Sequence, residues 1–199
     1  MLPNDADEVE LKQWVSTDRS KLETMVQPID DFIDAFLEKL ENLRRHDFIA
    51  KQQSNFLHEQ KETLKEGEFL VIGDFTENFS FVVQDEAQSF HWNNSMATLH
   101  PFVYYYTEDG EVKHSNFVLL SDCNIHDTVA VHLFQKRLIN HLRSRFDSLA
   151  KIIYFSDGCA GQYKNCKNFV NLCLHEEDFG APCEWHFFAT SHGKGPSDG

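Results

Sequence analysis

The sequence predicts an α/β domain built on a mixed β-sheet and preceded by an N-terminal helical extension. Two observations predict this fold class. From residue 67 onward, strand-like and helix-like segments follow one another in the order β-β-β-α-β-α-β. Residues 5–65 instead carry apolar side chains at spacings of three and four, which is typical of amphipathic helices. We therefore divide the chain into a helical extension over residues 1–66 and an α/β domain over residues 67–199.

The helical extension is expected to contain three helices. Apolar residues between Leu11 and Met25 predict the first, and those between Ile29 and Leu40 predict the second. Pro28 is expected to separate these two helices, because proline cannot continue a helix. Residues 46–65 predict the third helix, with Phe48 to Leu64 supplying its packing side.

Three strands are expected to open the α/β domain. Residues 68–83 and 96–106 are rich in β-branched and aromatic side chains, which favour strands. The polar stretch 108–111 predicts a hairpin turn, and residues 113–121 predict the third strand. The three strands should therefore include an antiparallel pair.

The remaining segments alternate between helix and strand. Asp127 or Thr128 is suited to cap a helix over about 129–149, and the apolar run 152–155 predicts a strand. A helix over about 161–175 and a strand over 184–189 follow, and Ser197 or Asp198 is suited to start a further, incomplete helix. Hairpins followed by β-α-β crossovers predict a mixed sheet in which the first and fourth strands can lie side by side.

Composition excludes several classes of protein. The 199 residues carry a formal net charge of −14, and the acidic excess is spread over both regions. Tight DNA binding through phosphate neutralisation by the chain alone is therefore disfavoured. The sequence contains neither an apolar run long enough for a membrane span nor a signal peptide, and its five cysteines form no CxxC pair. We expect an intracellular protein with reduced thiols that is not secreted.

Three aspartates are the candidate catalytic residues. Asp157 ends an apolar run and precedes Gly158, Asp74 interrupts another apolar run, and Asp198 follows the last predicted strand. Burial of an acid is costly unless a positive group offsets it, and a metal ion is one such group. Carboxylates suit Mg²⁺ or Mn²⁺, and three of them at one rim of the sheet predict a two-ion site for in-line displacement at phosphorus. Glu77 and Asp85 are rivals of Asp74 if the strand register differs.

Polar residues next to these acids are candidate DNA contacts. Gln162, Tyr163, Lys164 and Asn165 stand at the predicted start of a helix, where backbone N–H groups and a lysine can hold phosphate oxygens. The alternative is a solvated helix face.

Other histidines, lysines and cysteines have functional or structural interpretations. His192 and Lys194 stand in a glycine-rich stretch before Asp198, as DNA contacts or as plain loop residues. His91, Trp92 and His100 are expected to be packed residues of the sheet. A zinc site is a weak alternative, because the spacings do not give the usual pairs two to four residues apart; its ligands would be Cys159, Cys166, Cys173, Cys183 and His186.

The acidic residues and the segments around them carry a resemblance to a known family. The order of Asp74, Asp157 and Asp198 resembles the ribonuclease H-like catalytic core of cut-and-paste DNA transposases and retroviral integrases, the DDE/DDD group. The stretches IGDFTENFSF, FSDGCAGQYKN and EWHFFATSHGKGPSDG also resemble a set of transposon-derived animal proteins. The resemblance covers roughly residues 40–199.

The resemblance implies a function and a set of partners. The three aspartates would be the metal ligands of an enzyme that cleaves DNA and transfers the strand with Mg²⁺ or Mn²⁺. Its partners would be DNA in the form of transposon ends and further copies of itself as a homo-oligomer, with no membrane, and its location would be the nucleus. One alternative is a catalytically inactive, truncated or domesticated transposon-derived interaction module. A phosphatase or nuclease for smaller substrates is a third reading.

Overall fold

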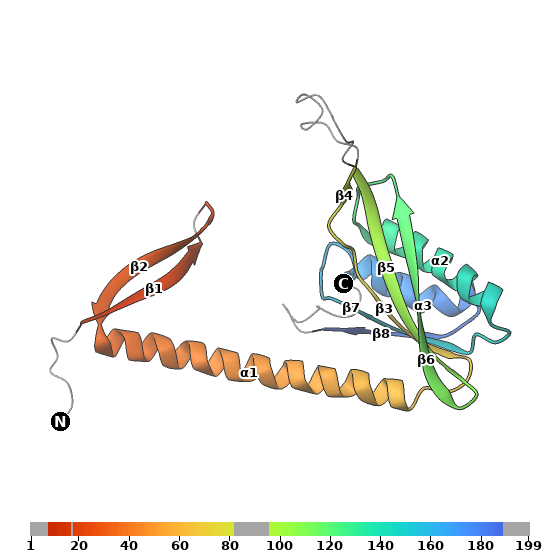
Figure 1. Cartoon of the computed structure of the whole chain (residues 1–199), viewed down its shortest axis with the longest axis horizontal. Coiled ribbons are helices and arrows are strands. Elements are labelled where there is room, and N and C mark those ends of the chain that lie inside the picture. Colours follow the sequence, from red (N-terminus) through yellow and green to blue (C-terminus); the bar gives the residue numbers. More distant parts are fainter. Residues whose placement is uncertain (1–7, 17, 82–95, 189–199) are drawn as a thin grey trace. The chain divides into compact units, whose positions relative to one another are not determined.

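The structure is a computed structural model that describes residues 8–16, 18–81 and 96–188. It contains two compact units, Met1–Ile49 and Ala50–Gly199 (Figure 1). The helix α1 (Ile29–Glu62) contributes residues to both units.

The first unit begins with a β-hairpin. Strand β1 (Glu8–Ser16) pairs antiparallel with β2 (Ser20–Pro28), and the pairing runs from Glu8 opposite Pro28 to Ser16 opposite Ser20. The prediction of a helix between Leu11 and Met25 was therefore wrong. Residues such as Leu11 and Val15 are four positions apart, so they satisfy the alternation of a strand as well as the spacing of a helix.

Helix α1 is continuous, whereas the sequence predicted two helices in this region. Pro28 immediately precedes the helix, and Asp30 and Asp31 lie in its first turn, where negative charge favours the helix dipole. Between Leu40 and His46 the sequence contains neither glycine nor proline, so nothing interrupts the helix there.

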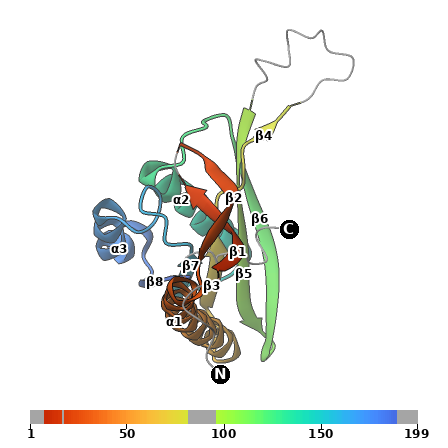
Figure 2. The same ribbon diagram turned by 90° about the vertical axis from the view of Figure 1, so that its left-hand side faces the viewer.

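The second unit is organised around a six-stranded mixed sheet. Its strands are β3 (Glu68–Gly73), β4 (Phe79–Ser80), β5 (Met96–Glu108), β6 (Glu111–Ser121), β7 (Lys151–Ser156) and β8 (Cys183–Phe187). The order is β4-β5-β3-β7-β8, with β6 also paired to β5, and β5 and β6 form a long antiparallel ribbon (Figure 2). Strand β3 is antiparallel to β5 and parallel to β7, and β7 is parallel to β8. The predicted mixed sheet, with its first and fourth long strands side by side, is confirmed.

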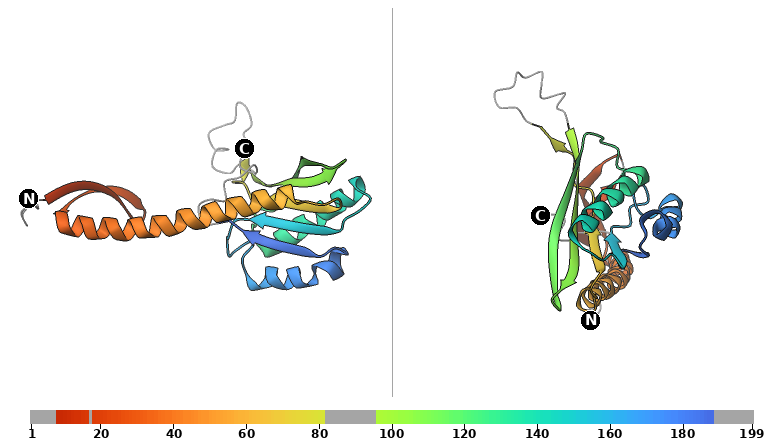
Figure 3. Two further views of the ribbon diagram at one scale, coloured as in Figure 1. Left: turned by 90° about the horizontal axis from the view of Figure 1, so that it is seen from below. Right: turned by 90° about the vertical axis from the view of Figure 1, so that its right-hand side faces the viewer.

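Helices cover both faces of the sheet. Helices α2 (Thr128–Arg145) and α3 (Cys166–Phe179) lie on one side of it (Figure 3). The core on this side joins Val71, Tyr104, Leu138, Tyr154 and Phe179, among others. A second core on the opposite face contains Leu64, Leu70, Ile72, Ile153 and Phe155, with Leu57 from the last turns of α1 packed against it. Full burial of each such side chain contributes about 1.5–3 kcal/mol.

Helices α2 and α3 both follow a polar residue: Asp127 precedes α2 and Asn165 precedes α3. The Asp127 carboxylate accepts hydrogen bonds from the Val129 and Ala130 N–H groups at 3.0 and 2.9 Å, which confirms Asp127 as the N-cap of α2. The next helix starts at Cys166, five residues later than predicted, because the chain first forms a turn over residues 160–163.

No helix in the described part of the chain is long and apolar enough to cross a membrane.

Candidate active site

Asp74 and Asp157 follow the ends of two neighbouring parallel strands. Ile72 of β3 pairs with Phe155 of β7, so each aspartate comes two residues after a member of the same pair. Because parallel strands run in the same direction, both acids belong to the same edge of the sheet. Both side chains are partly buried. This edge, the carboxyl end of β3 and β7, is the candidate active site.

The Asp74 carboxylate is held close to the strand that carries it. Its Oδ1 accepts a hydrogen bond from the Phe75 N–H at 2.8 Å and lies 3.5 Å from the hydroxyl of Tyr163. The chain after Asp74 stays beside β5, because the Thr76 N–H donates to the Leu99 carbonyl at 3.1 Å. These contacts keep the carboxylate at the strand end.

Asp157 is positioned by a tight loop that connects β7 to α3. The Asp157 Oδ1 accepts from the Cys159 N–H at 3.0 Å. The Cys159 carbonyl in turn accepts from the N–H groups of Gln162, Tyr163 and Lys164 at 3.3, 2.8 and 3.0 Å. The loop between Asp157 and α3 is therefore compact, and it fixes the carboxylate relative to Tyr163.

Tyr163 lies close to both acids. Its side chain is buried, and its hydroxyl is 2.9 Å from Nε2 of His100. Burial raises the pKa of Tyr163 well above its usual 10, and the negative charges of Asp74 and Asp157 raise the pKa further. The phenol therefore stays protonated and can donate its hydrogen bond to His100 or to Asp74.

His100 is a neutral imidazole inside an aromatic cluster. Its ring centroid lies 4.6 Å from that of Phe75 and 4.4 Å from that of Phe102. Burial lowers the pKa of His100 from its usual 6.5 to about 3. The expectation that His100 is a packed residue of the sheet is confirmed, but its contact with Tyr163 also connects it to Asp74.

Gly73 allows this close packing. A Cβ atom at Gly73 would lie 2.6 Å from the Phe102 ring and 3.1 Å from His100 Cε1. A cavity of about 10 Å³ is lined by Gly73, His100, Ser156 and Tyr163, among others, which is room for about one water molecule. A glycine directly before a candidate catalytic acid was the sequence signal for this packing.

The four predicted DNA contacts near Asp157 have different surroundings in the structure. They lie before α3 and not within it. The Asn165 side chain accepts from the Asn168 N–H at 3.0 Å and caps α3, and Tyr163 is buried as described. Gln162 is partly buried, and its backbone carbonyl accepts a hydrogen bond from the Thr128 hydroxyl at 3.3 Å. Lys164 is exposed, with Nζ 5.5 Å from the Phe187 ring centroid.

Several predicted site residues lie outside the described residues. These are Asp198, His192 and Lys194, together with Asp85, His91 and Trp92. Glu77, the other rival of Asp74, is described and is exposed in the loop after β3. The third predicted metal ligand thus stays a prediction from the sequence.

The described residues contain no cluster of metal ligands. Within residues 8–16, 18–81 and 96–188, no group of three or more His, Cys, Asp or Glu side chains is arranged so that it could hold a metal ion. The alternative zinc site finds no support in this part of the chain. Cys183 is instead partly buried, and burial raises the pKa of its thiol to about 12.

The fold and the site define a mixed α/β domain with two acids at the ends of adjacent parallel strands. Residues 53–199 match the family described as Domain of unknown function (DUF8701), and the chain belongs to this family. Residues 1–44 match a second family, described as Domain of unknown function (DUF8700). Neither a curated protein nor a solved structure matches the chain.

Proposed function

We propose that this chain is a transposase-like protein whose ribonuclease H-like domain cleaves DNA strands and joins them to new ends with the help of divalent metal ions. The observation that carries the proposal is the pairing of β3 with β7, which gives Asp74 and Asp157 the same register at one edge of the sheet. The element order β3-β5-β6-α2-β7-α3-β8, with the two-residue β4 inserted, is the order that the sequence patterns predict, and we propose that it is a ribonuclease H-like order.

The donor atoms at this edge fit Mg²⁺ or Mn²⁺. Asp74 and Asp157 offer hard carboxylate oxygens, and the two charges act on the same buried phenol of Tyr163. Divalent cations of this kind prefer carboxylates and keep several water ligands, so two protein carboxylates and an open surface suit them. Asp198 is proposed as the third ligand on the basis of the sequence.

The protein residues around the site would hold the ligands in place. The Tyr163 hydroxyl, held at 2.9 Å from His100, can donate to Asp74, and the Cys159 N–H orients Asp157. When bound, a pair of ions would activate the attacking oxygen and stabilise the leaving oxygen of the phosphodiester. Lys164, which is exposed beside this edge, would contact a DNA phosphate.

Nicking of a supercoiled plasmid tests this proposal. We expect the wild-type chain to convert the plasmid to the open-circular form only when Mn²⁺ or Mg²⁺ is present. Asp157→Asn should slow the conversion at least ~100-fold, because it removes a metal ligand with almost no change in shape. Asp109→Asn is the matched control. Asp109 lies in the β5–β6 turn, next to the residues of β5 that pair with the start of β3, whereas Asp74 follows the end of β3.

Two results would contradict active DNA cleavage by this site. Conversion that is equally fast in Asp157→Asn would assign the cleavage to another site. Metal binding without any conversion would favour the alternative of an inactive transposon-derived module.

A further inference from the structure

The first compact unit, Met1–Ile49, has no buried core of its own in the residues that the structure describes. Among residues 8–16 and 18–49, no side chain is buried. Several large apolar side chains of this unit are exposed, including Trp14, Val26, Phe36 and Leu43. Exposed apolar side chains gathered in this way mark an interaction surface.

The exposed side chains of α1 form one stripe. Ile33, Phe36, Leu40 and Leu43 follow one another at spacings of three and four residues, and each is between 44 and 60 % exposed. This is the spacing of the inward-facing positions of a coiled coil over two heptads. Phe32 widens the stripe, because its ring stacks on that of Phe36 with centroids 6.0 Å apart.

The charges of α1 are divided along its length. Residues 29–38 carry four acidic and no basic side chains, whereas residues 39–51 carry four basic and two acidic ones. Two such helices side by side in opposite directions bring the acidic half of each beside the basic half of the other. The helix dipoles also favour this arrangement.

We propose that the stripe Ile33–Leu43 of α1 binds the same stripe of a second copy of this chain, with the two helices antiparallel. Phe36 of each copy then packs against Leu40 of the other, and Ile33 packs against Leu43. Asp30 lies beside Arg44 of the second copy, so two ion pairs flank the apolar layers. This interface uses the other family segment, residues 1–44, and does not depend on the proposed activity.

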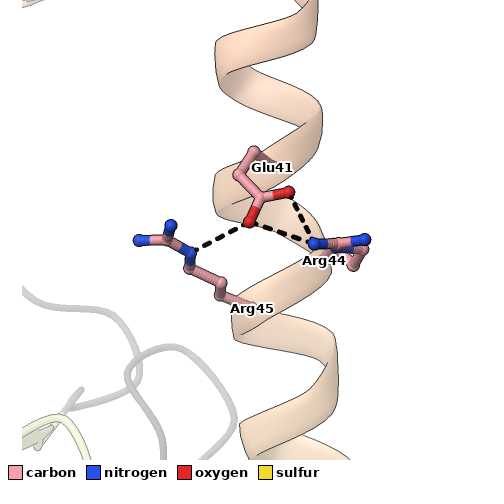
Figure 4. A network of polar contacts seen from close by, with 3 residues as sticks. All are labelled: Glu41, Arg44 and Arg45. Atoms are coloured by element: carbon pink, nitrogen blue, oxygen red, sulfur yellow. Dashed lines mark hydrogen bonds and ion pairs between the residues drawn. The ribbon is translucent and has the colours of Figure 1, made fainter.

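A parallel pair is disfavoured by the same charges. In a parallel two-stranded coil, the side chain of Lys39 lies beside Arg44 of the partner helix, which places like charges together. Figure 4 shows that Arg44 and Arg45 now both contact Glu41, with nitrogen–oxygen distances of 3.0 and 3.1 Å. The Arg44 side chain is 78 % exposed, and such exposed pairs are weak, so Arg44 can turn to a second copy at little cost.

The molar mass of the full chain in solution tests for the second copy. Sedimentation velocity at about 50 μM should give twice the chain mass of 23.1 kDa, and Phe36→Glu with Leu40→Glu should return it to the single mass. The matched control is Glu59→Gln with Glu62→Gln, which changes two exposed charges of α1 outside residues 29–51 and should leave the mass doubled. A wild-type chain with the single mass, or a doubled mass that survives Phe36→Glu with Leu40→Glu, would overturn the proposal.

A charge exchange tests the direction of the two helices. Arg44→Asp should weaken the pair about tenfold or more, because it replaces each ion pair with two carboxylates side by side, and Asp30→Arg should weaken it equally by pairing two guanidinium groups. The double change Asp30→Arg with Arg44→Asp should restore the wild-type dissociation constant. Tighter association of Arg44→Asp would instead indicate a parallel pair and would overturn the antiparallel arrangement. Circular dichroism of each variant checks that α1 is still helical.

Discussion

The hydroxyl of Tyr163 lies 2.9 Å from Nε2 of His100, and both residues are buried. They are 63 positions apart in the sequence and come from the loop before α3 and from β5. This hydrogen bond connects the loop that carries Asp157 to the strand beside Asp74. We therefore expect it to stabilise the geometry of the candidate active site as well as the fold.

Removal of the Tyr163 hydroxyl should destabilise the protein. In Tyr163→Phe the Nε2 atom of His100 loses this hydrogen bond in a buried environment, which costs about 1–3 kcal/mol of the free energy of unfolding. Urea denaturation at pH 7.5 measures the change. Tyr105→Phe is the control, because the Tyr105 ring is partly exposed beside the Lys61 ammonium group. Equal stability of the two variants would show that the hydrogen bond contributes little.

Gly73 should not tolerate a larger side chain. Gly73→Ala places a methyl group 2.6 Å from the Phe102 ring, and the resulting overpacking should lower the free energy of unfolding by about 1–3 kcal/mol. Gly161→Ala should change it by less than about 0.5 kcal/mol, since no atom lies within 4 Å of a Cβ there. Thermal or urea unfolding of both variants provides the comparison. A Gly73→Ala protein as stable as Gly161→Ala would contradict the close packing at the end of β3.

Buried His100 should make stability depend on pH. Burial lowers its pKa from 6.5 to about 3, so below pH 6.5 the unfolded chain takes up a proton that the folded chain does not. The free energy of unfolding is therefore unaffected by the protonation of His100 above pH 6.5, and it decreases as the pH falls toward 3, by at most ~1.4 kcal/mol per pH unit. His100→Phe should flatten the stability curve between pH 7 and 5.

The same series of measurements has an internal control. His114 is exposed on β6, so His114→Phe should keep the slope of the wild type. Burial also lowers the pKa values of His141 and His175, so a smaller slope should persist in His100→Phe. An unchanged slope in His100→Phe would show that His100 is protonated with little penalty in the folded protein.

Much of the sheet could be predicted because its strands carry strong local signals. The predicted strand 152–155 lies within β7, and the acid at position 127 caps its helix as expected. The strand predicted over residues 68–83 instead ends at Gly73, and Phe79–Ser80 forms a separate short strand.

The sequence of the hairpin β1–β2 predicts a helix because Leu11 and Val15, four positions apart, satisfy both periods, and Leu11 and Trp14, three positions apart, have helical spacing. In this region strand pairing, and not local propensity, decides the structure.

The candidate site was only partly accessible from the sequence. The two acids are marked by the strands that precede them, whereas the contact between His100 and Tyr163 depends on the pairing of distant strands. Tyr163 was expected to contact DNA, but its side chain is buried near the acids. A local pattern does not show on which side of a loop a tyrosine lies.

Asp74 and Asp157 together are proposed to hold a divalent metal ion. Isothermal titration of the full chain with Mn²⁺ tests it most directly, with Asp74→Asn and Asp157→Asn measured beside the control Asp109→Asn. We predict that the wild type and Asp109→Asn bind Mn²⁺ equally well and that each of the other two variants binds it at least ~10-fold more weakly. Equal binding in all four proteins, or no binding in the wild type, would contradict the account.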